Sequence, residues 1–302
     1  MKPSDWSGVL PAITTPFQAD GSVDLAFLAK HANWMMDAGC RGIVALGSLG
    51  EGATLTFEEK GAILSALVDA IGDRGPVIAG VSALSTADAV RLAQEAERRG
   101  CKGLMVLPPY VYNSGDWREA RAHVETVFES TGLSCMLYNN PIAYGLDFKP
   151  DQVAQLCIHQ NLHAVKESSA DIRRIAAIRA LVGDRLAILV GVDDVLVEGV
   201  AAGAVGWIAG LVNAFPKESV DLFDLAAAGR WHEAERLYHW FLPLLRLDTV
   251  PKFVQYIKLT QQVVGMGDER VRAPRLQVVG DERDEVLGVI QEALRNAPEP
   301  AH

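Results

Sequence analysis

Short runs of apolar residues recur along the chain, and each is followed by a longer segment with a helix-like pattern. Apolar runs of about four to eight residues are typical of strands that are buried on both faces. We expect eight such strands, at 8–13, 42–46, 76–81, 103–107, 133–138, 162–166, 187–191 and 205–209. Eight alternating strand and helix units predict an α/β fold in which a parallel sheet closes into a (β/α)8 TIM barrel.

The strand pattern stops after the eighth run, and the rest of the chain has helical patterns, at 217–264 and 283–296, with glycine and proline at the breaks. No linker or low-complexity tract separates this region from the barrel, so it is expected to pack against the barrel. The pattern therefore predicts a barrel with the active site at 1–228 and a C-terminal helical region at 229–302.

Composition and charge exclude several classes of partner. The 302 residues are 49% apolar and have a formal net charge of −10, without a basic patch. Such a surface is not expected to bind nucleic acid or an anionic membrane. The N-terminus has no apolar signal region and no run of about 18 apolar residues occurs, so we expect a cytoplasmic protein. The cysteines lack metal-ligand spacing and are expected to be reduced thiols: Cys40, Cys101, Cys135 and Cys157.

Lys166 is the first candidate for chemistry, because it ends the sixth apolar run. A buried ammonium group is unfavourable, and burial lowers its pKa, so such a lysine keeps some neutral amine near pH 7. A neutral amine can attack a ketone and form a Schiff base. A lysine that only reaches solvent or pairs with Glu167 would give the same pattern, and the choice between these readings depends on the neighbouring strand ends.

Two other strand ends have chemical features as well. In a (β/α)8 barrel, the active site lies at the carboxyl ends of the strands. Gly47, Ser48 and Leu49 follow the second run in a glycine-flanked turn that can bring backbone N–H groups to a small carboxylate. Tyr138 ends the fifth run, one strand before Lys166. Three adjacent features of this kind favour a catalytic lysine over a structural one.

These segments resemble the signatures of the dihydrodipicolinate synthase and N-acetylneuraminate lyase family. The matching motifs are Gly-Ser-Leu-Gly-Glu at 47–51, Tyr-Asn-Asn-Pro at 138–141 and Val-Lys-Glu at 165–167. The strand-seven turn at 191–194 and Arg-Ala-Pro at 272–274 also look like family features. The resemblance implies a (β/α)8 barrel with trailing helices, a homotetramer, and catalysis without a metal or an organic cofactor.

The resemblance also implies roles for individual residues. Lys166 would form a Schiff base with a 2-oxo acid, Tyr138 would transfer protons, and Ser48 with the backbone of Leu49 would hold the substrate carboxylate. The implied substrate-binding set is Gly47, Leu49, Asn140, Asp193 and Ile208. Further candidates are Tyr112, Tyr144 and Asp194, although Asp194 could equally cap the following helix. We interpret three other charged residues as structural: Glu51, Lys258 and Arg272.

One departure from the family pattern concerns the second substrate. In the dihydrodipicolinate synthases that this chain resembles, an arginine follows the Tyr-Asn-x-Pro motif and binds the carboxylate of the second substrate. This chain has Ala143 at that position. Losing a charge-assisted contact of this kind removes roughly 1.5–3 kcal/mol. Leu49 also replaces a hydroxyl residue of the synthases. The segment at 109–112 is longer than the synthase version, which leaves open whether Tyr110 or Tyr112 reaches a neighbouring subunit.

The polar residues near Tyr138 suggest a hydroxylated substrate. The segment that contains Asn140 and Tyr144, together with Leu-Asp-Thr at 247–249, looks most like the family's subgroup of hydroxyproline catabolism. Members of that subgroup deaminate 1-pyrroline-4-hydroxy-2-carboxylate to 2,5-dioxopentanoate. The alternatives are a 2-keto-3-deoxy sugar acid dehydratase or aldolase and 4-hydroxy-tetrahydrodipicolinate synthase. A non-catalytic sensor of 2-oxo acids is a further alternative, and borohydride trapping with pyruvate separates it from an enzyme.

Overall fold

The computed structural model describes residues 1–111 and 115–298, and its centre is a barrel of eight parallel strands. Each expected apolar run overlaps one of the strands, which are β1 Gly8–Pro11, β2 Ile43–Ala45, β3 Val77–Val81, β4 Gly103–Val106, β5 Ser134–Asn139, β6 Leu162–Glu167, β7 Ala187–Val190 and β8 Gly206–Ala209. The hydrogen-bonded order is β1-β8-β7-β6-β5-β4-β3-β2, and a parallel bridge between Ala12 and Val44 joins the two ends. The predicted (β/α)8 barrel is confirmed.

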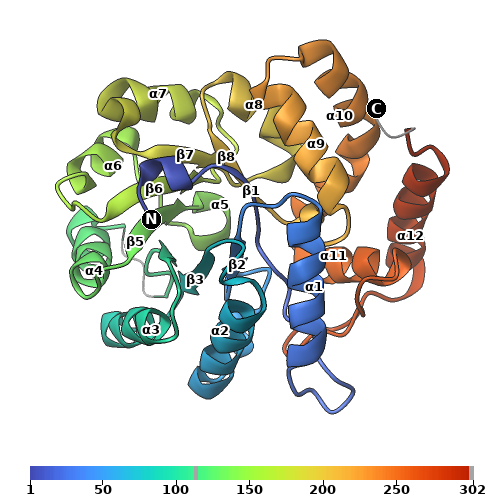
Figure 1. Cartoon of the computed structure of the whole chain (residues 1–302), viewed down its shortest axis with the longest axis horizontal. Coiled ribbons are helices and arrows are strands. Elements are labelled where there is room, and N and C mark those ends of the chain that lie inside the picture. Colours follow the sequence, from blue (N-terminus) through green and yellow to red (C-terminus); the bar gives the residue numbers. More distant parts are fainter. Residues whose placement is uncertain (112–114, 299–302) are drawn as a thin grey trace.

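Helices surround the barrel and then continue beyond it (Figure 1). The helices between and after the strands are α1 Leu25–Asp37, α2 Phe57–Ile71, α3 Thr86–Arg98, α4 Trp117–Glu129, α5 Pro141–Tyr144, α6 Pro150–Leu156, α7 Arg173–Val182, α8 Leu196–Ala201 and α9 Pro216–Ala227. The trailing helices are α10 Trp231–Leu245, α11 Phe253–Val263 and α12 Gly280–Arg295. Within the described residues, no helix has the length and apolar character needed to cross a bilayer.

Local sequence explains where the first helices begin and end. At the start of α2, Thr56 Oγ1 accepts from the backbone N–H of Glu59, and the Glu59 carboxylate accepts from the N–H of Thr56. This capping box satisfies two N–H groups that have no partner within the helix. After α1, Gly39 has a φ of +103°, a left-handed conformation that a residue with a Cβ rarely adopts. The chain can therefore turn directly from α1 toward β2.

The core has two parts, one inside the barrel and one between the barrel and its helices. The inner part is formed by inward-facing side chains of the strands, with Trp6 at its amino end, and includes Leu10, Val44, Ile78, Met105, Met136, Tyr138, Ala164, Leu189 and Ile208. Trp6 is fully buried and donates from Nε1 to Ser134 Oγ at 2.8 Å. Side chains thus fill the amino end of the barrel, and the carboxyl end remains for chemistry.

The trailing helices differ from the expected pattern in one respect. The helical pattern at 217–264 contains not only the expected break at Gly229 but a second one, at 246–252, where a short 3-10 helix (η6, Arg246–Asp248) separates α10 from α11. Pro243 lies inside α10 and Pro251 precedes α11, and proline interrupts helical hydrogen bonding. This second break brings Asp248 next to Gly210 at the end of β8.

Candidate active site

Lys166 lies near the end of β6 and points into the carboxyl end of the barrel. Its side chain is 6% exposed, and its Nζ lies 4.3 Å from the centre of the Tyr138 ring. A Cβ at Gly191, just after β7, would come within 2.5 Å of Lys166 Cε, so Gly191 leaves the space that the lysine occupies. Among the described residues, Lys166 has neither a hydrogen-bond acceptor nor an ion-pair partner within bonding distance.

The environment of Lys166 increases the share of its neutral form relative to an exposed lysine. Burial lowers the pKa of the Lys166 ammonium to about 8, although the charges of Asp248 and Asp193 act in the opposite direction. A pKa near 8 leaves about one amine in ten unprotonated at neutral pH. An amine in this state can act as a nucleophile toward a carbonyl or an imine, and this role of Lys166 stays a prediction.

Tyr138 is the register partner of Lys166 across the β5–β6 pair. Asn140 Nδ2 donates a hydrogen bond to Tyr138 Oη at 2.9 Å. Burial raises the pKa of Tyr138 to about 12, while the hydrogen bond from Asn140 acts in the opposite direction. The hydroxyl is therefore protonated in the resting site and lies beside the amine, where it can give a proton to a reacting group.

The turn after β2 contains Gly47, Ser48 and Leu49. Glu51 closes this turn, with its backbone N–H donating to Ser48 O at 3.1 Å. Its buried carboxylate accepts from Lys258 Nζ at 2.7 Å and from the Arg272 N–H at 3.0 Å. These contacts confirm the structural interpretation of Glu51, Lys258 and Arg272, because they fix the turn to the C-terminal region.

The Ser48 hydroxyl forms a hydrogen bond with the Tyr144 hydroxyl. Tyr144 ends the four-residue helix α5, and its ring packs edge-on against Tyr138 with the ring centres 5.9 Å apart. Asn140 caps this helix by accepting from the Ala143 N–H at 3.0 Å. Hydroxyl and amide groups from the turn after β2, the residue after β5 and α5 thus gather around Tyr138, the neighbour of Lys166.

Tyr110 packs against the other face of this cluster, with its ring centre 5.7 Å from that of Tyr144. Tyr112, the other tyrosine of this segment, lies outside the described residues. Burial also raises the pKa of Tyr144 above that of a free tyrosine. Ser48 and Tyr144 therefore form a neutral hydrogen-bonding pair.

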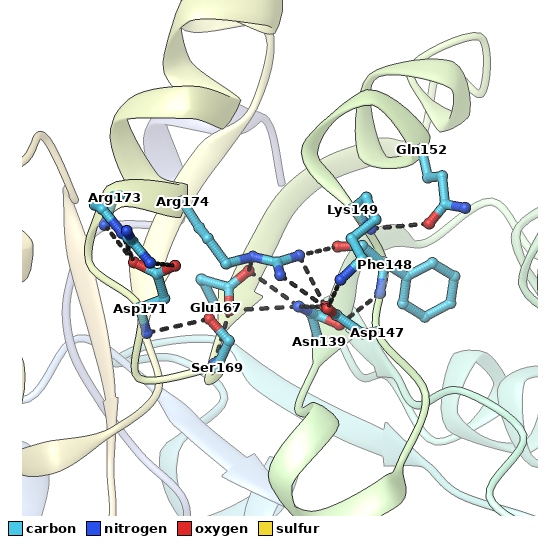
Figure 2. Close-up of polar contacts among 10 residues, drawn as sticks. All are labelled: Asn139, Asp147, Phe148, Lys149, Gln152, Glu167, Ser169, Asp171, Arg173 and Arg174. Atoms are coloured by element: carbon cyan, nitrogen blue, oxygen red, sulfur yellow. Dashed lines mark hydrogen bonds and ion pairs between the residues drawn. The ribbon is translucent and has the colours of Figure 1, made fainter. Parts of the chain in front are cut away.

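A polar network next to the pocket fixes the ends of β5 and β6 (Figure 2). Asn139 Nδ2 donates to both oxygens of Glu167, at 3.3 and 3.1 Å, and to Asp147 Oδ1 at 3.2 Å. Arg174, from α7, lies 2.8 Å from Asp147 and 3.5 Å from Glu167. Asn139 follows Tyr138 and Glu167 follows Lys166, so this network holds the two candidate catalytic residues in register.

Asp193 was predicted to bind substrate, but its contacts are with protein donors. Its carboxylate accepts from Trp207 Nε1 at 2.9 Å, from the Gly210 N–H at 3.1 Å and from the Leu211 N–H at 2.8 Å. We therefore assign Asp193 to holding the turn after β8. Asp194 does not act as the cap of α8 and lies 3.6 Å from Arg246.

Ile208 faces the barrel interior from β8, in the same apolar cluster as Tyr138, and is 1% exposed. It can form part of the apolar floor of the pocket. One acid was missed among the candidates, because Asp248 lies far along the chain in a segment with a helical pattern, and only the break between α10 and α11 brings it to the barrel. In the ranges 1–111 and 115–298, no three side chains of His, Cys, Asp or Glu gather as metal ligands would.

Comparison with known proteins gives the family. A model of the dihydrodipicolinate synthetase family matches residues 5–293. The 4-hydroxy-tetrahydrodipicolinate synthase of Citrifermentans bemidjiense is 32% identical over 269 residues, which are 89% of this chain and 92% of that protein. The synthase of Haloarcula marismortui is 31% identical over 287 residues, which are 95% of this chain and 93% of that protein. The crystal structure of dihydrodipicolinate synthase from Bacillus anthracis has a TM-score of 0.91 at 29% identity and covers 96% of this chain and 99% of its own. The chain therefore belongs to the dihydrodipicolinate synthetase family and is a Schiff-base-forming lyase.

Proposed function

We propose that this lyase uses Lys166 to deaminate 1-pyrroline-4-hydroxy-2-carboxylate to 2,5-dioxopentanoate. The observation that supports this choice most directly is the turn after β5. Ala143 is an exposed residue at the position where synthases carry a clamping arginine, and the next residue, Tyr144, contacts Ser48 and Tyr138 instead. The groups around Tyr138 on this side are thus neutral hydroxyls, which suit a hydroxylated substrate better than a second carboxylate.

Each residue of the pocket has a role in this proposal. The turn at Gly47, Ser48 and Leu49 binds the substrate carboxylate, the Lys166 amine attacks the carbon that bears it, and Tyr138 moves protons on and off the intermediate. Asn140 orients the Tyr138 hydroxyl through its hydrogen bond. The protonated imine then withdraws electrons, so a proton can leave from the adjacent carbon.

The overall reaction consumes one water. Attack by Lys166 on C2 and opening of the ring give a Schiff base with a free amine at C5. Loss of a proton from C3 and of the hydroxyl from C4 releases one water. Isomerisation then produces an imine at C5, and hydrolysis of this imine and of the Lys166 Schiff base consumes two waters and releases ammonia and 2,5-dioxopentanoate.

A second candidate is 4-hydroxy-tetrahydrodipicolinate synthase, because relatives such as those from Citrifermentans bemidjiense and Haloarcula marismortui have that name. That reaction condenses pyruvate with aspartate semialdehyde. With Ala143 in place of the arginine, we expect pyruvate to form an imine with Lys166 and the condensation to be slow. A 2-keto-3-deoxy sugar acid dehydratase remains a related alternative, since it shares the elimination step.

The deciding experiment is a panel of substrates with the purified wild-type protein. Ammonia is measured with 1-pyrroline-4-hydroxy-2-carboxylate, condensation with pyruvate and aspartate semialdehyde, and water elimination with 2-keto-3-deoxy sugar acids. Borohydride trapping with pyruvate serves as the control for a working Lys166. Ammonia release is the expected result, whereas efficient condensation without ammonia release would overturn the proposal. Absence of any covalent adduct would instead favour the non-catalytic sensor.

The proposal includes a homotetramer. Two large apolar side chains near Tyr110 and Tyr144 are strongly exposed in the single chain, Leu84 and Ile142, each at 72%. Exposed apolar side chains of this size support an interface between copies of the chain. Sedimentation velocity tests the assembly, and a single monomer peak at micromolar concentration would contradict it.

A further inference from the structure

Asp248 ends the short 3-10 helix between α10 and α11, and its carboxyl group lies against Gly210, directly after β8. A Cβ on Gly210 would overlap both carboxyl oxygens of Asp248. The absence of a side chain at Gly210 therefore gives this carboxyl its place at the carboxyl end of the barrel. In its ionised form this carboxyl influences the pKa of Lys166 and of Tyr138, so it lies at the same end of the barrel as these two residues.

The Asp248 carboxyl has no hydrogen-bond partner among the described residues, and its Oδ1 is shut off from solvent. Asp193, on the other side of Gly210, accepts hydrogen bonds from Trp207 and from the backbone of Gly210 and Leu211. Burial and the nearby Asp193 charge hold the pKa of Asp248 well above its usual value. Burial also raises the pKa of Asp193, to about 6, against its hydrogen bonds. When the environments of two acids differ in this way, one is protonated and can donate a proton, here Asp248, and the other is a carboxylate, here Asp193.

The strand order places Asp248 on the other side of Lys166 from Tyr138. Lys166 is on β6, Tyr138 is on the adjacent β5, and β7 and β8 follow on the other side. Because Asp248 lies over the end of β8, the amine has one proton-transfer group on each side. The proposed function uses Tyr138 for the carbon proton but leaves the departing hydroxyl without a donor, and hydroxide is a poor leaving group unless it is protonated.

We propose that Asp248 is the general acid of the elimination step, and that it protonates the hydroxyl two carbons from the imine carbon. The C4–O bond breaks, the electron pair of the enamine forms the C3=C4 double bond, and the Asp248 proton leaves with the oxygen as water. The Asp248 carboxylate regains a proton from solvent before the next turnover. This inference rests on the proposed function and names the substrate feature that the site selects, a hydroxyl at C4.

The test compares Asp248→Asn, which keeps the shape of the side chain but has no acidic proton, with wild type. Glu218→Gln on α9 is the matched control, because burial also raises the pKa of this carboxyl and it lies outside the pocket. Ammonia release from 1-pyrroline-4-hydroxy-2-carboxylate should fall roughly 100- to 10,000-fold in Asp248→Asn. Borohydride trapping with pyruvate, which has no C4 hydroxyl, should stay within about threefold of wild type, as general acid catalysis of elimination does not affect it.

A better leaving group separates acid catalysis from a merely structural role. The analogue with chloride at C4 needs no proton for departure, so Asp248→Asn should convert it within about tenfold of the wild-type rate. Gly210→Ala, which displaces the carboxyl without removing it, should give the same pattern in milder form. Turnover of the hydroxyl substrate within threefold of wild type, an equal loss with chloride, or loss of pyruvate trapping would each overturn the proposal.

A linear 4-hydroxy-2-oxo acid distinguishes failure of this inference from failure of the proposed function. If wild type releases no ammonia from the pyrroline but eliminates water from the linear acid, the deaminase assignment is wrong and Asp248→Asn is tested on the linear acid alone. A loss of elimination in the variant would then support the general acid. A wild-type protein that eliminates water from neither substrate would overturn both.

Discussion

Two lysines are buried in the part of the chain that the structure describes, and the surroundings of their ammonium groups differ. Lys258 is 1% exposed and donates to Glu51 Oε1 at 2.7 Å and to the Arg270 carbonyl at 2.6 Å. Lys166 is 6% exposed, its Nζ lies 4.3 Å from the centre of the Tyr138 ring, and among the described residues it has no hydrogen-bond or ion-pair partner. Burial lowers the pKa of both lysines and nearby carboxylate charges oppose it at both, but at Lys258 the Glu51 carboxylate also accepts a hydrogen bond from the ammonium group.

This difference separates a structural lysine from a chemical one. A buried charge with a partner contributes to the fold, whereas a buried amine without one is unfavourable for stability and is kept for its reactivity. The two lysines also lie on different kinds of secondary structure. Lys258, on α11, ties the C-terminal helices to the turn at Glu51, and Lys166, on β6, is fixed by the network of Glu167, Asn139 and Arg174 (Figure 2).

The comparison is tested most strongly by removing the amine of Lys166. In Lys166→Ala we expect turnover to fall roughly 10,000-fold or more, because no other group replaces a covalent nucleophile. Borohydride trapping with pyruvate should be lost, while circular dichroism and thermal unfolding should show an intact fold. Retention of a tenth of the wild-type turnover would show that Lys166 is not the nucleophile.

The next effect concerns the hydroxyl beside Lys166. Tyr138→Phe removes only that hydroxyl, so imine formation should continue while proton transfer slows by roughly 100- to 10,000-fold. Single-turnover kinetics with mass spectrometry of the trapped adduct separates the two steps. Asn140→Ala is the companion variant, with a smaller loss, because it keeps the Tyr138 hydroxyl and removes its hydrogen bond from Asn140, together with the cap on the Ala143 N–H. Wild-type turnover of Tyr138→Phe across the pH range would exclude a proton-transfer role.

Lys258→Met tests the other half of the comparison. It leaves the buried Glu51 carboxylate with only the longer ion pair to Arg275, at 3.7 Å, and breaking a buried ion pair in this way costs about 3–5 kcal/mol. Chemical denaturation should show this loss in the free energy of unfolding. The double variant Lys258→Met with Glu51→Gln should recover part of it, since the uncompensated charge is gone. Unchanged stability in Lys258→Met would mean that the pair has no structural role.

The fold could be predicted from the sequence because all eight strands are short apolar runs, and such runs depend little on distant residues. The candidate site could be predicted to the extent that its residues end those runs, as Lys166 and Tyr138 do. The lysine alone was ambiguous between a surface and a catalytic role, and the neighbouring motifs decided between them.

The remaining parts of the site depend on contacts between distant segments. Asp193 is of a residue type that can bind a substrate hydroxyl. Its carboxylate oxygens, however, accept hydrogen bonds from Trp207 and from the turn after β8, and no local sequence pattern reveals these contacts. Asp248 reaches the pocket because a helix breaks and because Gly210 leaves room for its carboxyl. Arg174 joins the network from α7 in the same way.

The smallest expected effect is on the pH dependence of the free energy of unfolding, and it is specific to a buried lysine without a partner. Lys166 has a pKa of about 8 in the folded protein, below the value of 10.5 for a free lysine. Between these values the unfolded chain binds more protons than the folded one, so the stability of the wild type rises with pH through this window. Lys166→Met has no such dependence and removes the penalty of a buried amine. We expect it to be more stable than wild type at pH 7, by on the order of 2 kcal/mol.

The extra stability of Lys166→Met over wild type should be constant below pH 8 and should shrink as the pH rises from 8 toward 10.5. Urea denaturation of both proteins at pH 7, 8, 9 and 10 measures it, with the exposed Lys102→Met as the control. Lys102→Met should run parallel to wild type, because an exposed lysine has a similar environment in the folded and unfolded chain. A Lys166→Met profile that also ran parallel to wild type would contradict the low pKa of Lys166. It would also remove the physical distinction between Lys258, which has an ion-pair partner, and Lys166, which has none. The reactivity of the Lys166 amine and its cost in stability both follow from the lack of such a partner.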